Sequence, residues 1–342
     1  MNYQELRIAF LTYLSRSGST ILARLLDEYD DICVTTEGEI PLELFGVKSY
    51  SPITFYSKDD LELYLNNILG KTRVASWNIP NNQILNLCNE VGFPINGPQL
   101  VYFLLYAYKE IYMPKARLVI YKACPFMPWH ITESKHHFPE ALYIHLIRDP
   151  RAVYYSQKKS IDPFKGTPFS RSPLKTAMEW KRAIRLISDY PEEKVKIIKY
   201  EELVDRPKDL LKKLILFLGV SPSKDHISEI QFSDRMEKVD KNLHREIDLQ
   251  PDSKKAFVWK DRLLINEIQI IDHYLNELIA SQGYEIHYSR EKSSNFQLFS
   301  IYMNEKKEIL YAIFSRIFRV TSRLLFRPKY FLIQLKLKMF ND

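Results

Sequence analysis

A short polar run near the start of the chain has the composition of an anion-binding loop. It reads Arg16, Ser17, Gly18, Ser19 and Thr20. The arginine supplies a full positive charge, the hydroxyls donate hydrogen bonds, and the glycine lets a bound group approach the backbone closely. A helix that begins here would also direct its unpaired N–H groups at an anion. The run therefore predicts an oxyanion site, with simple helix capping as the alternative.

Two acidic residues follow the first helix at a spacing that could place them near this loop. Glu37 and Glu39 come just after Cys33-Val34-Thr35, which has the composition of a short strand. Active sites in open α/β sheets lie beyond the carboxyl ends of the strands, so a carboxylate here could act as a general base. The alternative is that both are solvated loop acids.

A second candidate anion site contains Arg148 and Ser156, eight residues apart. Between them, Asp149 is a good N-cap and Pro150 suits the first position of a helix. An apolar strand precedes the arginine. The segment therefore predicts a second strand–turn–helix unit with a cation and a hydroxyl at the helix N-terminus.

Alternating strand and helix patterns position these residues. Apolar runs predict strands at 6–11, 33–35, 118–122, 142–147 and 195–200. Helical periodicity predicts helices at 21–29, 59–69, 82–89, 100–111, from 173 onward, 210–218 and 261–281. Residues 91–98 and 158–173 are predicted loops, and a helical stretch is expected before His137. Residues 41–114 carry no chemical motif and are rich in aromatics, so they are our candidate for acceptor recognition.

Composition limits the class of protein. The 342 residues are 46% hydrophobic and carry a formal net charge of +7, which suits an anionic cofactor, an acidic substrate or a membrane surface. No zinc-ligand spacing or RNA-binding signature appears, so neither a metal site nor a nucleic-acid partner is predicted. Three scattered cysteines make a reducing compartment the default.

The two ends of the chain lead to different expectations. The N-terminus passes straight into the first strand, so we expect no signal peptide or anchor and a cytoplasmic protein. Residues 291–342 form a basic, amphipathic segment. Within it, 305–340 could lie on an anionic membrane, making the protein peripheral, or could pack on the domain or on a second subunit.

Five stretches resemble the sulfotransferase family. The first loop lacks the G-x-x-x-x-G-K-[ST] pattern of nucleoside triphosphatases, which disfavours ATP chemistry. Instead, Ser-Arg-Ser-Gly-Ser-Thr resembles the 5′-phosphosulfate loop of enzymes that use 3′-phosphoadenosine 5′-phosphosulfate (PAPS), with Ser15 in place of the usual proline. The other four stretches are Lys122-Ala123-Cys124-Pro125, the Arg148/Ser156 pair, the run from Tyr200 through Pro207 to Gly219, and the basic pair Lys254 and Lys255.

The resemblance implies roles for individual residues. It makes the 16–20 loop the 5′-phosphosulfate site and Glu37, about twenty residues after Arg16, the general base, with Glu39 in reserve and His130, His136 and His137 next. Lys122 would reach the sulfuryl group. The nucleotide would be bound by Arg148 and Ser156 at its 3′-phosphate, by Tyr200 beside adenine, and by Lys254 and Lys255 over the phosphates, without a metal.

Together these features predict a three-layer α/β domain with a central parallel sheet, similar to the nucleotide-kinase-like sulfotransferase fold, over residues 1–290, with a helical tail at 291–342. The resemblance points to the carbohydrate or tyrosylprotein branch and a bacterial-type cytosolic member. It implies sulfuryl transfer from PAPS to a hydroxyl, foremost on a carbohydrate or glycolipid, with a peptide or small alcohol also open. The alternatives are a P-loop kinase or NTPase, and a non-catalytic nucleotide-binding, membrane-associated protein.

Overall fold

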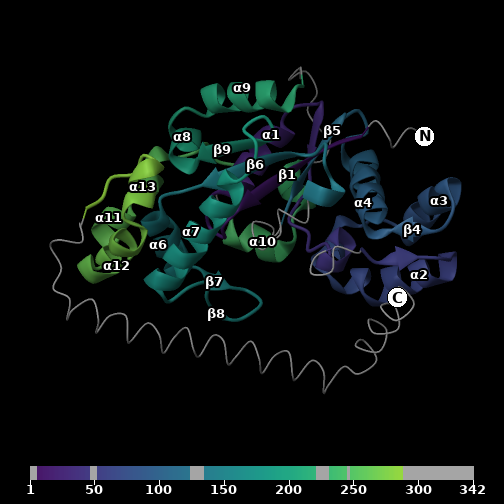
Figure 1. The fold of residues 1–342 in the computed structure, drawn as a ribbon, viewed down its shortest axis with the longest axis horizontal. Helices are drawn as coiled ribbons and strands as arrows, with labels where there is room; N and C mark the ends of the chain where they lie inside the picture. Colours follow the sequence, from purple (N-terminus) through teal and green to yellow (C-terminus); the bar gives the residue numbers. More distant parts are fainter. Residues whose placement is uncertain (1–5, 47–51, 124–134, 221–230, 245–246, 288–342) are drawn as a thin grey trace.

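The computed structural model describes residues 6–46, 52–123, 135–220, 231–244 and 247–287. Its centre is a five-stranded parallel sheet in the order β2-β5-β1-β6-β9 (Figure 1). The strands are β1 (Arg7–Tyr13), β2 (Ile32–Val34), β5 (Leu118–Lys122), β6 (Leu142–Ile147) and β9 (Val195–Lys199). Each strand predicted from its apolar run is therefore present, and all five are parallel.

The first strand lies in the middle of the sheet. Phe10 of β1 is opposite Tyr121 of β5 on one side and Tyr143 of β6 on the other. β1 is buried on both faces over nearly its whole length, as expected for a central parallel strand. The loop that follows β1 is thereby placed between the loops that follow its two neighbours.

Helices cover both faces of the sheet, which makes the three layers. On one face, α1 (Ser19–Asp27), α8 (Tyr200–Asp205) and α9 (Pro207–Leu218) pack against Ala9 and Leu11 of β1. On the other, Ile8 and Phe10 join an aromatic-rich core with α4 (Gly97–Tyr112). Successive side chains of β1 thus pack against helices on opposite faces of the sheet, because side chains alternate along a strand. The predicted α/β class is confirmed.

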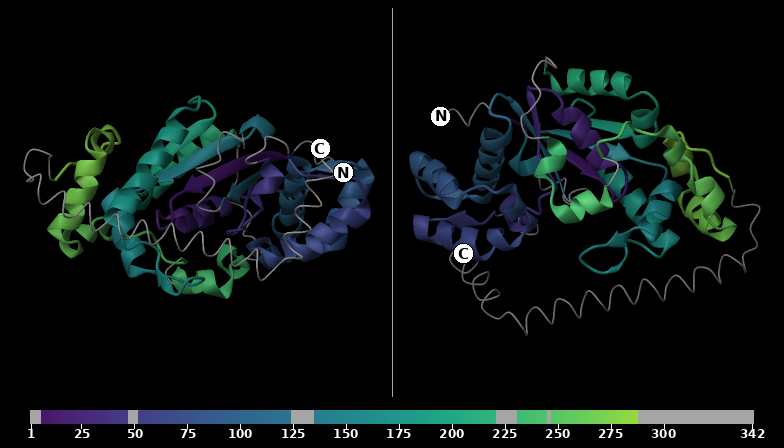
Figure 2. Two further views of the ribbon diagram at one scale, coloured as in Figure 1. Left: turned by 60° about the horizontal axis from the view of Figure 1, so that its bottom comes forward. Right: turned by 180° about the vertical axis from the view of Figure 1, so that it is seen from behind.

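The elements of residues 41–114 lie at one end of the molecule (Figures 1 and 2). They are the short helices η2 (Leu42–Phe45), η3 (Leu69–Lys71) and η4 (Arg73–Trp77), the helices α2 (Lys58–Asn67), α3 (Asn81–Val91) and α4, and a two-stranded ribbon of β3 (Thr54–Phe55) and β4 (Ile95–Asn96). Strand β4 falls in the predicted 91–98 loop, which corrects that expectation. A two-residue strand leaves no periodic pattern to detect.

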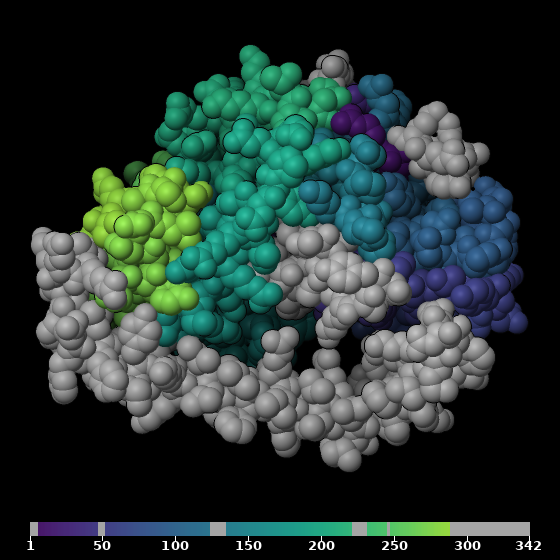
Figure 3. All heavy atoms as spheres, viewed as in Figure 1, coloured from purple at the N-terminus to yellow at the C-terminus, as the bar shows by residue number. Residues whose placement is uncertain are grey.

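A further group of helices packs near the carboxyl end of β6, where Ile147 joins their hydrophobic cluster. The group contains α6 (Pro150–Lys159), α7 (Pro173–Ser188), α11 (Trp259–Arg262), α12 (Ile265–Leu275) and α13 (Glu277–Ser281), which share one hydrophobic cluster. The space-filling view shows α11–α13 in yellow-green at the end of the molecule opposite α2 and α3 (Figure 3). The predicted N-cap Asp149 is confirmed, since its side chain accepts a hydrogen bond from Arg151 N. Ser172 caps α7 in the same way by accepting from Lys175 N.

Two sequence expectations about these segments are wrong. The predicted loop at 158–173 contains a hairpin of β7 (Ile161–Asp162) and β8 (Thr167–Pro168), which turns at Gly166 with a φ of 66°. The single helix predicted at 261–281 is three helices, because Leu264 is extended and Asn276 has φ 38° and ψ −116°. Hydrophobic periodicity continues across such breaks, so it does not reveal them.

Other expectations fall on residues outside the described ranges. Most of the helical stretch expected before His137 lies there, as do Cys124 and the whole tail from 291 to 342. Cys33 and Cys88 are buried and free. Among the described helices, none combines the length and the apolar character needed to cross a membrane.

Candidate functional site

The loop after β1 forms a tight cradle that only glycine can complete at its centre. Arg16 and Gly18 both have left-handed backbone angles, with φ of 74° and 96°. A Cβ atom on Gly18 would lie 2.3 Å from Cδ2 of Tyr200, far inside contact distance. Ser17, Ser19 and Thr20 are buried. The tight turn predicted between the first strand and the first helix is therefore present, and α1 begins directly after it.

The second predicted anion site joins the first. Arg16 Nε donates a hydrogen bond to Ser156 Oγ at 3.3 Å, and Arg148 Nη1 donates to the carbonyl oxygen of Arg16 at 3.2 Å. This contact follows from the sheet order, because β1 and β6 are neighbours and both run toward this edge. The structure thus brings together Arg16, Arg148 and Ser156, which lie up to 140 residues apart in the sequence.

Tyr200 and the loop near residue 255 complete the wall of the cradle. The guanidinium of Arg148 lies over the buried ring of Tyr200, which begins α8 directly after β9. Arg148 Nη2 donates to the carbonyl oxygen of Lys255 at 3.1 Å. The Lys254 and Lys255 side chains are exposed in η7 (Ser253–Ala256). Their segment lies beside the cradle, and the hydrogen bond to Arg148 is accepted by the Lys255 backbone.

The electrostatics of the cradle favour an anion. Burial, followed by the like charge of Arg148, lowers the pKa of the Arg16 guanidinium, whereas Glu37 acts in the opposite direction. Two neighbouring guanidinium groups are therefore incompletely compensated by acidic side chains. In addition, Arg148 Nε is buried and has no hydrogen-bond partner among the described residues. An unsatisfied buried donor beside two cations is suited to an anionic oxygen.

The carboxylate predicted as a base sits between two cations. Glu37 Oε2 accepts from Lys122 Nζ at 2.9 Å, and Glu37 Oε1 lies 3.2 Å from Arg73 Nη1. Burial opposes ionisation of Glu37, but the charges of Lys122 and Arg73 outweigh it, so its pKa is below the usual value. Glu39, by contrast, is exposed. Of the two acids left open by the sequence, Glu37 is the one that the structure places with Lys122.

Sequence reasoning missed three residues of the site. Arg73, at the start of η4, forms an ion pair with Asp240 of α10 (Lys238–Leu243) as well as with Glu37. His244 Nε2 lies 3.2 Å from Thr20 Oγ1. Burial, then the charges of Arg16 and Lys122, lower the pKa of His244 to about 3, so it is neutral near pH 7. None of the three belongs to a motif, and no local pattern marked them.

The β7–β8 hairpin contributes two aromatic rings to the same region. The Arg16 guanidinium carbon lies 5.9 Å from the ring centre of Phe169, and that of Arg73 lies 5.5 Å from the ring centre of Phe164. Phe164 is 66% exposed, although it is a large hydrophobic residue. The hairpin therefore connects the cradle with the Glu37 end of the site.

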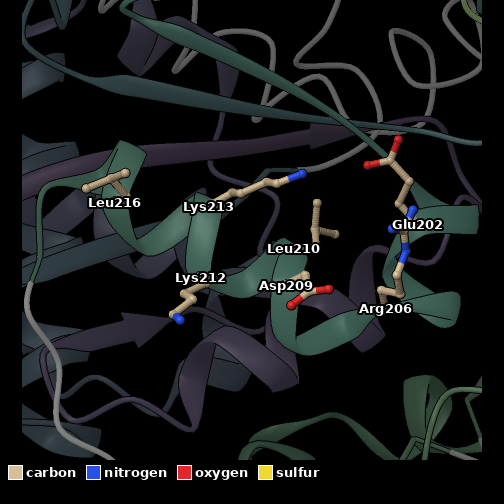
Figure 4. A pocket seen from close by; sticks show the side chains of 7 residues that line it. All are labelled: Glu202, Arg206, Asp209, Leu210, Lys212, Lys213 and Leu216. Atoms are coloured by element: carbon tan, nitrogen blue, oxygen red, sulfur yellow. The ribbon is translucent and has the colours of Figure 1, made fainter.

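A separate surface hollow lies away from these residues. Its wall is formed by α8 and α9 and carries charges of both signs (Figure 4). The lining residues are Glu202, Arg206, Asp209, Leu210, Lys212, Lys213 and Leu216. None of the site residues predicted from the sequence is among them, so the hollow is distinct from the cradle.

Comparisons with known proteins agree with this architecture. A family model described as "Sulfotransferase family" matches residues 9–225. The nodulation protein NoeE of Sinorhizobium fredii (strain NBRC 101917 / NGR234) is 22% identical over 307 residues, which cover 81% of this chain and 66% of NoeE. The chain thus spans just under two thirds of that relative.

Two solved structures share the fold. The sulfotransferase domain of the Synechococcus PCC 7002 olefin synthase is 18% identical, with a TM-score of 0.50 over 82% of this chain and 96% of that domain. The sulfotransferase domain from the curacin biosynthetic pathway is 17% identical, with a TM-score of 0.50 over 82% of this chain and 99% of that domain. Since the family model spans both strand–loop–helix units and more than half of the chain, the protein belongs to the sulfotransferase family.

Proposed function

We propose that the protein transfers a sulfuryl group from PAPS to an acceptor hydroxyl, with Glu37 as the general base. The observation that carries the proposal is the meeting of a cationic cradle with a carboxylate held by a lysine. Arg16 in the cradle and Glu37 interact electrostatically, so the two parts belong to one site. An anionic donor and a proton acceptor are the two requirements of sulfuryl transfer to a hydroxyl.

The described residues fit the nucleotide. Arg16, the buried hydroxyls of Ser17, Ser19 and Thr20, and the N–H groups at the start of α1 would bind the 5′-phosphosulfate. The free Nε of Arg148 and the hydroxyl of Ser156 would bind the 3′-phosphate. Tyr200 would lie beside adenine, and Lys254 and Lys255 would close over the phosphates. These assignments are part of the proposal, and they follow the family resemblance residue by residue.

In the transfer step one sulfur–oxygen bond replaces another. The acceptor oxygen forms a bond to sulfur while the bond from sulfur to the bridging oxygen of the 5′-phosphate breaks. The hydroxyl proton passes to Glu37, and 3′-phosphoadenosine 5′-phosphate leaves with the negative charge. Arg16 and Lys122 would stabilise the charge that develops on the sulfuryl and leaving groups. Because a sulfuryl group carries less charge than a phosphoryl group, fixed donors of this kind suffice in the proposal.

The proposed acceptor is a carbohydrate or glycolipid. The ring of the exposed Phe164 faces Arg73, which pairs with Glu37, so it would be available to an acceptor near that carboxylate. Aromatic rings can pack on the apolar faces of sugars. The same proposal has three further parts. It assigns the protein to the carbohydrate branch of the family, gives it a cytoplasmic location, and has residues 305–340 contact an anionic membrane.

Calorimetric titration tests the donor first. The protein should bind 3′-phosphoadenosine 5′-phosphate without Mg²⁺ and should bind ATP with Mg²⁺ much more weakly; the reverse order would support a kinase or NTPase. Incubation with PAPS and a panel of glycans, glycolipids, peptides and small alcohols then tests transfer by mass spectrometry. Nucleotide binding without transfer to any member of the panel would favour a non-catalytic protein.

A further inference from the structure

The two oxygens of Glu37 are held by cations of different kinds. Lys122 reaches Oε2 with a compact ammonium at the end of a flexible stem, whereas Arg73 reaches Oε1 with a planar guanidinium. A carboxylate oxygen has two lone pairs, so each oxygen keeps one acceptor position beyond its cation. Both carboxylate oxygens are therefore held by a cation, and each can still accept one more hydrogen bond.

Arg73 is itself fixed from several sides. It opens η4, where the side chain of Thr72 caps the backbone at Val74 N. Its guanidinium pairs with Asp240, lies 3.9 Å from Glu237 at Nε, and faces the ring of Phe164. Contacts from α10 and from the β7–β8 hairpin therefore restrict the guanidinium in the orientation that meets Glu37.

The segment that carries Glu37 packs against the same part of the 41–114 region. A Cβ on Gly38 would lie 2.3 Å from the ring of Trp77, the last residue of η4. On either side of Glu37, Thr36 N donates to the hydroxyl of Tyr108, and the Gly38 carbonyl accepts from Tyr121 at 2.8 Å. The short helix η4 thus carries Arg73 at its start and contacts the Glu37 segment through Trp77 at its end.

We propose that Arg73 is a positioning residue that orients the Glu37 carboxylate toward the acceptor hydroxyl, an inference that rests on the proposed role of Glu37 as base. When Lys122 turns to the sulfuryl group, Oε2 is released and can accept the proton. Arg73 keeps Oε1, so the carboxylate does not rotate away. The proton of the acceptor hydroxyl then moves to Oε2 as the acceptor oxygen bonds to sulfur.

The same contact predicts a change in pH dependence. The groups that act on Glu37 come from four elements: Lys122 from β5, Arg73 from η4, Arg16 from the cradle, and His244 together with Asp240 from the α10 segment. Burial raises the pKa of Glu37, and the cations bring it below its usual value. Removing Arg73 removes one of these cations, so the carboxyl should hold its proton to higher pH.

The test compares Arg73→Gln with Lys71→Gln, which removes an exposed cation two residues away. Arg73→Gln should lower kcat about ten- to a hundredfold, move the acid limb of the kcat–pH profile to higher pH, and leave the affinity for 3′-phosphoadenosine 5′-phosphate within about twofold. Lys71→Gln should match the wild type. Arg73→Lys should return the acid limb close to its wild-type pH but recover kcat less completely. The lysine restores the positive charge but not the planar guanidinium that orients the carboxylate.

Two further variants guard against a general loss of structure. Arg73→Gln leaves Asp240 without its cation, so the double variant Arg73→Gln/Asp240→Asn removes both partners. Its acid limb should still shift upward, but by less than in Arg73→Gln, because Asp240 repels the ionised Glu37. In the Glu37→Gln background, Arg73→Gln should cause little additional loss of kcat, since the two residues act as one unit. Fully additive losses would overturn the inference.

A measurement without turnover separates this inference from the proposed function. The carboxyl carbon of Glu37, assigned by its absence in Glu37→Gln, is titrated by ¹³C NMR in the wild type and in the Arg73 variants. An unchanged titration and pH profile in Arg73→Gln, with turnover lost in Glu37→Gln, would overturn the positioning role alone. Retained turnover in Glu37→Gln would instead show that the proposed base is wrong, and the inference would fall with it.

Discussion

The guanidinium carbon of Arg148 lies 4.2 Å from the centre of the Tyr200 ring. The two residues come from neighbouring strand ends, Arg148 after β6 and Tyr200 after β9. Gly18, in the loop after β1, lies against the Cδ2–Cε2 edge of the same ring. The proposed nucleotide site therefore lies where the carboxyl ends of β1, β6 and β9 meet.

Replacement of Arg148 tests the 3′-phosphate assignment. Arg148→Ala should weaken binding of a 3′-phosphorylated nucleotide by roughly ten- to a hundredfold more than binding of its 3′-dephosphorylated analogue, because a charge-assisted contact is lost only with the former. Calorimetry with both nucleotides measures the difference. Arg171→Ala, which removes an exposed arginine, serves as the control. Equal losses for the two nucleotides would contradict the assignment.

Glu37 and Glu39 form a matched pair for testing the base. Glu37→Gln keeps size and hydrogen bonding but removes basicity, so kcat should fall by roughly 10²–10⁴-fold while nucleotide affinity stays nearly constant. Glu39→Gln should cost much less, since Glu39 is exposed, and any effect should appear in the acceptor KM. Steady-state kinetics decide between them. Collapse in Glu39→Gln with near-normal kcat in Glu37→Gln would transfer the role to Glu39.

His145 predicts how stability depends on pH. It is buried in β6 with Nδ1 2.8 Å from Thr12 Oγ1, and burial lowers its pKa to about 4 from 6.5. The unfolded chain binds the proton of His145 more readily than the folded chain does. The contribution of the neutral His145 to the free energy of unfolding is therefore complete above about pH 6.5 and is lost as the pH falls toward 4. At 1.36 kcal/mol per pKa unit, it amounts to about 3 kcal/mol.

Urea unfolding between pH 4 and 7 measures this dependence. His145→Gln should flatten the fall in the free energy of unfolding relative to the wild type, whereas His287→Gln, which replaces an exposed histidine, should leave the slope unchanged. Parallel slopes for wild type and His145→Gln would show that His145 is not the group responsible.

The cradle could be predicted from sequence because local patterns determine it. The apolar run of β1, the polar turn and the periodic helix α1 are contiguous, and the Asp149–Pro150 start of α6 is equally local. Because β1 and β6 are neighbours in the sheet, the segments that follow them lie side by side, and Arg16 meets Ser156 without any additional sequence motif. Strands β5 and β6 matched their predicted limits for the same reason, since each is a continuous apolar run.

Arg73 and His244 could not be predicted in this way, because their roles depend on contacts between distant segments. Arg73 meets Glu37 and Asp240, and His244 meets Thr20, which is 224 residues earlier. An isolated arginine in a segment without a motif resembles any solvated surface residue. The breaks at Leu264 and Asn276 were missed for a related reason, because backbone angles are not visible in hydrophobic periodicity.

The C-terminal tail gives a separate prediction. Truncation near Ser289 should leave a folded domain that still binds 3′-phosphoadenosine 5′-phosphate but no longer sediments with anionic vesicles, because the basic residues of 305–340 are removed. Binding of the full chain should weaken as salt is raised. Vesicle sedimentation and calorimetry measure both properties. If the truncated chain unfolds, the tail is part of the domain core; if it sediments unchanged, the lipid contact lies elsewhere.

The central place of β1 in the sheet constrains how the protein is made. Arg7 pairs in register with Leu118, and Ala9 pairs with Leu142, so the first strand leaves the ribosome more than a hundred residues before either neighbour. Until then its apolar surface has no native partner, and closing such long loops is slow. The cradle cannot be complete before Lys255, whose carbonyl accepts from Arg148, has been synthesised, so shorter nascent chains are expected to require chaperone protection and to lack nucleotide binding.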